Sequence, residues 1–153
     1  MTLNIGDKAP DFAGKALDGS DISLGDFKGK QNVFLVFYAK AFSGVCALQL
    51  PRYNANLDGF KQRNTQVVAV SVDNSFAQQA FCDSLGGIDY PMLSDMTLDT
   101  ADAYGVKLPD GFSTRAEFAI DKEGIIRWLN VEASAANDTP TMDDIFSALD
   151  TLQ

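Results

Sequence analysis

Residues 32–38 read NVFLVFY and carry the strongest structural signal in the chain. From Val33 to Tyr38 every side chain is apolar or aromatic, without alternation with polar residues. Such a run is typical of a strand that is buried on both faces of a sheet. A second run, QVVAVSV at residues 66–72, has the same character. Two buried strands predict a covered sheet, with residues 32–38 near its centre.

The segment between these two strands has the period of a helix. Apolar residues recur at Cys46, Leu50, Tyr53, Leu57 and Phe60, in steps of four and three residues. This spacing places all five side chains on one face of a helix. We therefore expect a single helix with this face buried, and we expect Cys46 in its first turn.

A second helix is expected to follow the strand at residues 66–72. Asn74 can cap its start, and Gly86-Gly87 can end it after about Leu85. Its apolar side chains predict an inner face through Ala77, Phe81 and Leu85, joined by the neighbouring residues 76 and 80. On this face Cys82 would lie at the flank.

Shorter patterns complete the order of elements. Residues 11–24 predict a hairpin around Asp18-Gly19, a dipeptide suited to a tight turn. The other expected elements are a helix at 98–104, antiparallel strands at 115–120 and 125–131, and a last helix capped by Thr139 with Pro140 as its first residue. This order predicts an α/β, thioredoxin-like fold over residues 1–153 as a single domain. Its central mixed sheet is flanked by helices and carries an N-terminal β-hairpin extension.

Composition limits the partners that the chain is expected to have. The net charge is −9, from 21 acidic and 12 basic residues, which would repel phosphate backbones and anionic lipid surfaces. No apolar run reaches the roughly 20 residues of a membrane-spanning helix, and the first ten residues do not resemble a secretory signal. We therefore expect a cytoplasmic protein with no nucleic-acid or membrane partner.

The chain contains no His and only two Cys, Cys46 and Cys82. Without an imidazole, neither Ser-His-Asp nor Cys-His catalysis is available. Two thiolates alone cannot complete a tetrahedral zinc site, so no metal or cofactor is predicted. In a reducing compartment, a disulfide between the two Cys would be catalytic or transient rather than a permanent crosslink.

Cys46 is the candidate nucleophile. A Cys in the first turn of a helix has its thiolate form stabilised by free backbone N–H groups and by the positive end of the helix dipole. Attack of such a thiolate on a peroxide O–O bond needs no general base, but the leaving oxygen needs hydrogen-bond donors. Ser43, three residues before Cys46, and Arg115, at the start of a strand, are the candidate donors.

Many segments, in order along the chain, resemble the peroxiredoxins, in particular the bacterioferritin-comigratory (PrxQ-like) and alkyl hydroperoxide reductase E branch. The similar segments are 6–12 (GDKAPDF), 37–38, 41–46 (AFSGVC), 71–73, 90–95 (YPMLSD), 104–106, 115–121 (RAEFAID) and 124–127. The resemblance implies a thiol peroxidase that reduces hydrogen peroxide and organic hydroperoxides. It also implies Cys46 as the peroxidatic Cys, Ser43 as the hydroxyl donor and Arg115 as the cation.

Three further positions follow from the same resemblance. Ala39 stands where the family has a Pro that packs over the Cys, which would alter the shape of the pocket. Gln49 stands where many relatives have Glu, and it could hydrogen-bond to Arg115 without pairing its charge. Phe42 is expected in the core or, alternatively, at the mouth of the substrate pocket.

Cys82 lies 36 residues after Cys46 (82 − 46 = 36), in the second helix. In some members of the resembled branch this place holds the resolving Cys, which implies an intramolecular disulfide that a thioredoxin-like protein reduces. The family implies a monomer or a homodimer. Two alternatives stay open: resolution by an external thiol, and a peroxide sensor or holdase without turnover. A disulfide oxidoreductase is disfavoured, because Ala47-Leu48-Gln49 follows Cys46 in place of a CxxC motif.

Overall fold

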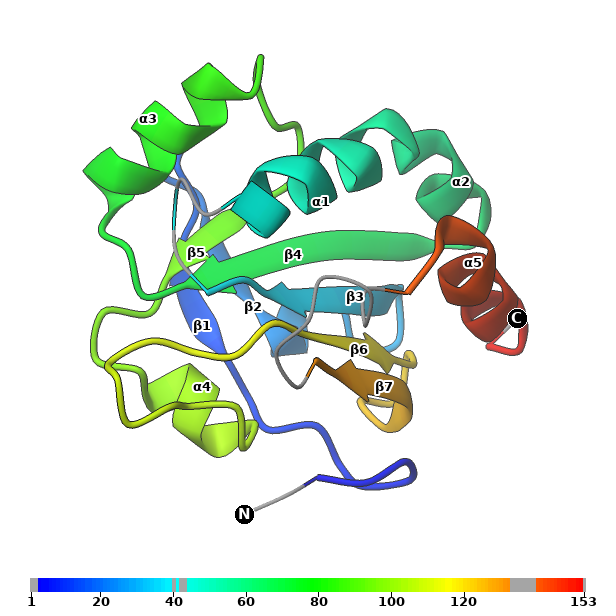
Figure 1. Ribbon diagram of the computed structural model, residues 1–153. Helices are drawn as coiled ribbons and strands as arrows, with labels where there is room; N and C mark the ends of the chain where they lie inside the picture. The colour runs from blue at the N-terminus through cyan, green and yellow to red at the C-terminus, as the bar shows by residue number, and fades with distance from the viewer. Residues whose placement is uncertain (1–2, 40, 42–43, 133–139, 153) are drawn as a thin grey trace.

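The computed structural model of the protein describes residues 3–39, 41, 44–132 and 140–152. Its centre is a five-stranded sheet in the order β5-β4-β3-β6-β7, and a separate hairpin of β1 and β2 lies beside it (Figure 1). The strands are β1 Ala13–Lys15, β2 Asp21–Ser23, β3 Asn32–Phe37, β4 Thr65–Ser71, β5 Met92–Ser94, β6 Ala116–Ile120 and β7 Ile126–Val131. The helices are α1 Gly44–Ala55, α2 Leu57–Gln62, α3 Ser75–Ser84, α4 Asp99–Ala103 and α5 Met142–Asp150, with a 3-10 turn η1 at Leu24–Asp26.

The sheet is mixed and is built around β3. This strand pairs in parallel with β4 and antiparallel with β6, and all six of its residues are buried. The expected fold class and the central position of residues 32–38 are therefore confirmed. Strand β5 was not predicted from the sequence, because a strand of three residues is too short to give a periodic pattern.

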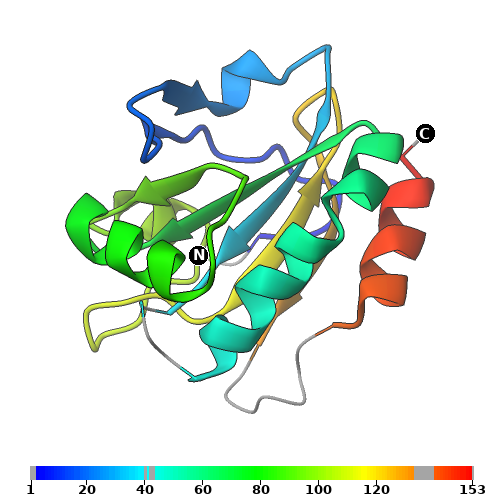
Figure 2. The same cartoon turned by 90° about the horizontal axis from the view of Figure 1, so that it is seen from above.

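Two apolar cores lie on the two faces of the sheet. One contains residues from α4 and the N-terminal segment, among them Tyr104 and Phe12. The other lies under α1, α2, α3 and α5 and contains both cysteines. Figure 2 shows α1 and α5 running beside one another on that face. No helix in the described part of the chain is long and apolar enough to cross a bilayer.

The single helix expected to carry Cys46 through Phe60 is divided in two. Helix α1 ends at Ala55 and α2 begins at Leu57. The amide of the intervening Asn56 donates to the carbonyl of Arg52 at 2.7 Å, and its backbone N–H bonds to Tyr53. The Asn56 side chain therefore occupies the Arg52 carbonyl, which the Asn56 backbone N–H would bond in a continuous helix. The chain bends at this point, and its apolar face stays buried.

Two other helices differ in detail from the prediction. In α3 the buried face runs through Gln78, Phe81 and Cys82. The predicted inner face was right at Phe81 and Leu85, but Phe76 is 85% exposed, and Cys82 lies on the buried face and not at the flank. Helix α5 is capped by Thr141, which forms a capping box with Asp144. The proposed cap Thr139 lies outside the described residues.

Candidate active site

Cys46 is the third residue of α1, and its side chain is completely buried. It belongs to the apolar core that also contains Leu50, Tyr53 and Tyr38. The backbone N–H groups of a first helical turn have no partner within the helix, so the sulfur lies at the positive end of the helix dipole. The location expected from the sequence is confirmed. It favours a thiolate in surroundings from which bulk water is largely excluded.

The loop before Cys46 is tied to the end of β4. The backbone N–H of Ala41 donates to Asp73 Oδ2 at 2.6 Å, and the Ser71 hydroxyl donates to the same oxygen at 2.9 Å. Ala39, which replaces the expected Pro, follows β3 and is half-buried. The candidate residues Phe42 and Ser43 lie outside the described residues. Asp73 therefore holds Ala41, in the segment between β3 and α1.

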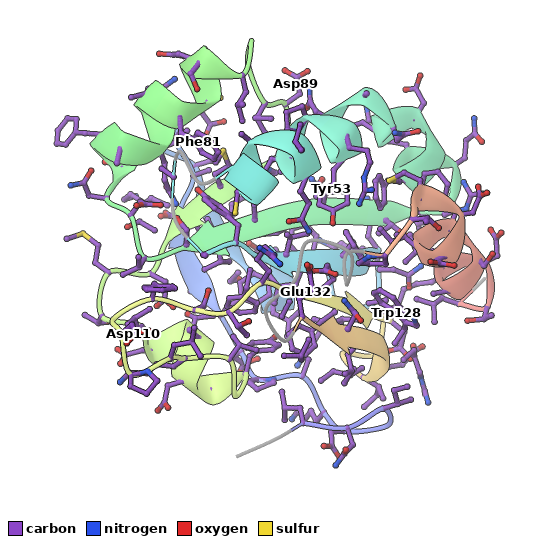
Figure 3. All side chains as sticks on the ribbon, viewed as in Figure 1. Tyr53, Phe81, Asp89, Asp110, Trp128 and Glu132 are labelled. Atoms are coloured by element: carbon purple, nitrogen blue, oxygen red, sulfur yellow. The ribbon has the colours of Figure 1, made fainter. Side chains whose placement is uncertain are left out.

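Arg115 lies on the face of the sheet that α1 covers. The neighbouring side chains Ala116 and Phe118 belong to the opposite core, so Arg115 and Glu117 project toward α1. The Arg115 Nε donates to Glu132 Oε1 at 3.0 Å, with the side chains 13% and 1% exposed. The backbone N–H of Glu132 also donates to the Arg115 carbonyl at 2.9 Å. Figure 3 labels Glu132, which lies just beyond the end of β7.

Gln49 does not make the hydrogen bond to Arg115 that the sequence suggested. Its Nε2 donates to the Tyr53 hydroxyl at 2.7 Å and, at the long limit of 3.5 Å, to Glu117 Oε2, while its Oε1 has no hydrogen-bond partner. The acidic partner of Arg115 is Glu132 instead. The acid that pairs with this Arg thus comes from the β6–β7 hairpin and not from the helix of the nucleophile.

Glu117 is the second acid of this group and is completely buried. Its Oε1 accepts a hydrogen bond from Asn130 at 3.1 Å. Burial, followed by the hydrogen bond and the negative charge of Glu132, raises the pKa of Glu117 to about 9. Neither Glu117 nor Glu132 was singled out from the sequence. The available signal was an acid within the otherwise apolar strand AEFAI.

This buried acid makes stability depend on pH. The unfolded chain releases the Glu117 proton near the ordinary pKa of 4.5, whereas the folded chain keeps it up to about 9. The free energy of unfolding should therefore fall as pH rises through this window, by up to about 1.4 kcal/mol per pH unit. In Glu117→Gln this dependence should be lost, as measured by urea unfolding at pH 5, 7 and 9. The exposed Glu123→Gln is the matched control, and parallel slopes for all three proteins would contradict the expectation.

Cys82 has a different environment from Cys46. It is 6% exposed, and the backbone N–H of Ile88 donates to its sulfur at 3.1 Å. Burial and the charges of Asp83 and Asp89 raise the pKa of the Cys82 thiol, against the effect of the Ile88 N–H. Its side chain also lines a pocket of about 420 Å³ that includes Gln79. Cys82 is therefore held as a thiol near neutral pH, which does not favour it as the first nucleophile.

The two cysteines are not joined by a disulfide and belong to one continuous apolar core. Tyr38 and Phe81 connect their surroundings, with ring centroids 6.0 Å apart. Phe81 is labelled on α3 in Figure 3. Burial, aided by the charges of Asp73 and of Cys46, raises the pKa of Tyr38 well above its ordinary value, so its hydroxyl stays neutral. Among the described residues, no group of three or more His, Cys, Asp or Glu side chains is arranged to hold a metal ion.

Comparisons with protein families, with single proteins and with solved structures all identify the same family. Residues 5–129 match the AhpC/TSA family. A chloroplastic 2-cysteine peroxiredoxin of Chattonella marina var. antiqua is 35% identical, over 100% of this chain and 80% of that protein. Peroxiredoxin tpx1 of Schizosaccharomyces pombe is 36% identical, over 100% and 83%. The crystal structure of reduced Plasmodium vivax 2-Cys peroxiredoxin superposes with a TM-score of 0.87 at 31% identity, over 96% and 94% of the two chains.

Proposed function

The chain belongs to the AhpC/TSA family, and from this premise we propose that Cys46 is the residue through which it reduces hydroperoxides. The protein is a thiol-dependent peroxidase. In the proposed reaction the Cys46 thiolate attacks one peroxide oxygen and the O–O bond breaks. The sulfur is oxidised to a sulfenic acid, and the second oxygen leaves with the electron pair and takes up a proton, giving water or an alcohol.

The observation that carries this proposal is the buried position of Cys46 in the first turn of α1. The two cysteines differ, because Asp83 and Asp89 surround Cys82 with negative charge, whereas Cys46 lies at a helix N-terminus. A helix N-terminus stabilises the attacking anion, and the enclosed site strengthens its electrostatic interactions. A chain with no His offers no imidazole to deprotonate a nucleophile, so the N-terminus of α1 is the feature that would stabilise the Cys46 anion.

Arg115 is proposed to stabilise the charge that develops on the leaving oxygen. Its Nε is occupied by Glu132, so the orientation of the guanidinium is fixed on the face covered by α1. A fixed donor costs little reorganisation during the reaction. We assign Ser43 the role of a second donor, and Ala39, Phe42 and Gln49 the lining of the substrate pocket. These four assignments come from sequence similarity.

Cys82 is proposed to resolve the sulfenic acid. The Cys82 thiol loses its proton and attacks the oxidised Cys46 sulfur. A disulfide forms, the S–O bond breaks, and the departing hydroxide takes up a proton to give water. Both residues lie in intact helices, so the first turn of α1 would unwind to allow the Cα separation of about 4.4–6.8 Å that a disulfide requires. Pro51 lies inside α1 and cannot donate a backbone hydrogen bond to Ala47, which makes this opening easier.

Replacement of Cys82 tests the resolving role. Cys82→Ser should still form a sulfenic acid on Cys46 with the first equivalent of peroxide, but it should not form the intramolecular disulfide. Intact-mass analysis separates the products, because the disulfide lowers the mass of the reduced chain by two hydrogens and the sulfenic acid adds one oxygen. If Cys82→Ser gives the same product as the wild type, Cys82 does not resolve Cys46. Resolution by an external thiol, or a sensor without turnover, would then be favoured.

The remaining assignments complete the proposal. The position of Cys82 in α3 is the feature by which we place the chain in the bacterioferritin-comigratory (PrxQ-like) and alkyl hydroperoxide reductase E branch, although the relatives compared above are 2-Cys types. We propose a thioredoxin-like protein as reductant, a monomeric or homodimeric enzyme, and a cytoplasmic location, where a catalytic disulfide is readily reduced. Turnover with recycled reductant distinguishes this enzyme from a sensor.

A further inference from the structure

Three ionisable side chains are buried together on the side of the sheet that α1 covers. Arg115 is 13% exposed, Glu132 is 1% exposed at its side chain, and Glu117 is completely buried. If all three were ionised, the group would carry a net charge of −1 in surroundings that solvate charge poorly. One added proton makes the group neutral. The question is which acid holds it.

The hydrogen bonds distinguish the two acids. Glu132 accepts from the Arg115 Nε at 3.0 Å, a charge-assisted contact that needs the ionised form. Glu117 accepts from two neutral amides, Asn130 at 3.1 Å and Gln49 at 3.5 Å, and its third polar contact is a hydrogen bond with the Glu132 carboxyl. These amide contacts favour a carboxylate less than a guanidinium does. The negative charge therefore belongs to Glu132 and the proton to Glu117.

We propose that Glu132 positions Arg115, and that a proton held on Glu117 keeps this arrangement neutral, so that its loss at alkaline pH slows the reaction at Cys46. The effect on rate rests on the proposed function, whereas the proton on Glu117 does not. When Glu117 ionises, a second carboxylate beside Glu132 would compete for Arg115 and add negative charge on the face of the sheet that carries Cys46. Both effects oppose the transition state, which carries negative charge itself.

The other titratable groups around Glu117 do not account for a slower reaction at alkaline pH. From α1, the site is faced by Cys46, Tyr53 and Arg52, whose guanidinium carbon lies 5.6 Å from the Tyr53 ring centroid. Burial and the charge of Glu117 raise the pKa of Tyr53 well above its ordinary value. Burial also raises the pKa of Tyr38, which directly follows β3. Both phenols therefore stay neutral through pH 10. The raised pKa of Glu117, about 9, falls within the range where the rate should decline.

The proton can be observed directly, because the chain contains only three glutamates. Labelling glutamate with carbon-13 at the side-chain carboxyl gives three signals, which Glu117→Gln, Glu123→Gln and Glu132→Gln assign. In the reduced wild type, Glu117 should titrate several pH units above the ordinary glutamate pKa of 4.5. In Glu132→Gln its titration should move to lower pH, because the like charge is lost and Arg115 becomes available. A Glu117 signal that is fully ionised at pH 7 would overturn the inference.

The rate is tested by stopped-flow oxidation of reduced protein with hydrogen peroxide between pH 6 and pH 10. The wild type should slow above pH 9, whereas Glu117→Gln should not. The ratio of the rate at pH 10 to that at pH 8 should be about tenfold higher in the variant. Glu123→Gln should follow the wild type. If the alkaline decline persists in Glu117→Gln, the inference is wrong. If no protein consumes peroxide but Glu117 still titrates late, the proposed function fails and the proton assignment stands.

Discussion

Cys46→Ser should lose peroxide reduction altogether. A hydroxyl at this position is not ionised near neutral pH, and no His is present to remove its proton. The rate of peroxide loss should fall on the order of 10³-fold or more, to the background of protein-free buffer. The measurement is hydrogen peroxide consumption per chain, first in a single turnover without reductant and then with excess dithiothreitol as reductant.

The second cysteine gives the matched control for this experiment. Cys82→Ser also lacks one sulfur, but it should still consume the first equivalent of peroxide, because Cys46 remains. Circular dichroism would check that Cys46→Ser keeps the wild-type fold, which is expected because Ser removes little volume from the buried site. Undiminished consumption by folded Cys46→Ser would refute the role of Cys46 and would direct attention to Cys82.

The sheet and the location of Cys46 at the start of a helix could be predicted because both depend on local pattern. An uninterrupted apolar run such as residues 32–38 has few alternatives to a buried strand, and β3 is buried throughout. The position of Cys46 followed from one helical period and from the loop before it. The hairpin around Gly19 was also predicted correctly. Gly19 has a φ of +88°, a conformation that Gly adopts readily, so this residue type marks the turn in the sequence.

The buried face of α3 could not be predicted in this way. It includes Gln78, whose amide donates to the Ser71 hydroxyl and to the Leu93 carbonyl, so a polar residue occupies a core position. A prediction based on apolar residues assigns Gln78 to the exposed face of the helix and Phe76 to the buried face. For this reason Cys82 was predicted at the flank of the helix, whereas it lies on the buried face. Tertiary hydrogen bonds between distant segments are not visible in the period of one helix.

The partner of Arg115 was missed for a related reason. Sequence similarity directed attention to Gln49 in the helix of the nucleophile, whereas the ion pair is made by Glu132, 17 residues after Arg115. The two residues meet because the β6–β7 hairpin continues past Val131, where the Glu132 N–H bonds to the Arg115 carbonyl. Strand register brings them together, and register depends on the whole sheet.

Arg115→Ala should lower the rate of Cys46 oxidation by about 10²-fold, because it removes the cation that we propose stabilises the leaving oxygen. The buried Glu132 would also lose its ion pair with Arg115. The second-order rate constant with hydrogen peroxide, measured by stopped-flow fluorescence of Trp128, is the appropriate readout. Arg115→Lys should recover only part of the rate, because an ammonium group lacks the planar fork that donates to Glu132 and to a substrate oxygen together.

Arg127→Ala is the matched control for Arg115→Ala. Arg127 lies on β7, pairs with Asp121 at 2.7 Å and is 48% exposed, so its loss removes the same unit of charge from the surface. Its rate should stay within about twofold of the wild type, because an exposed ion pair contributes little. If Arg115→Ala also stays within a few-fold, Arg115 has no role as a charge stabiliser. The helix N-terminus of α1 would then be the main source of electrostatic stabilisation for the transition state.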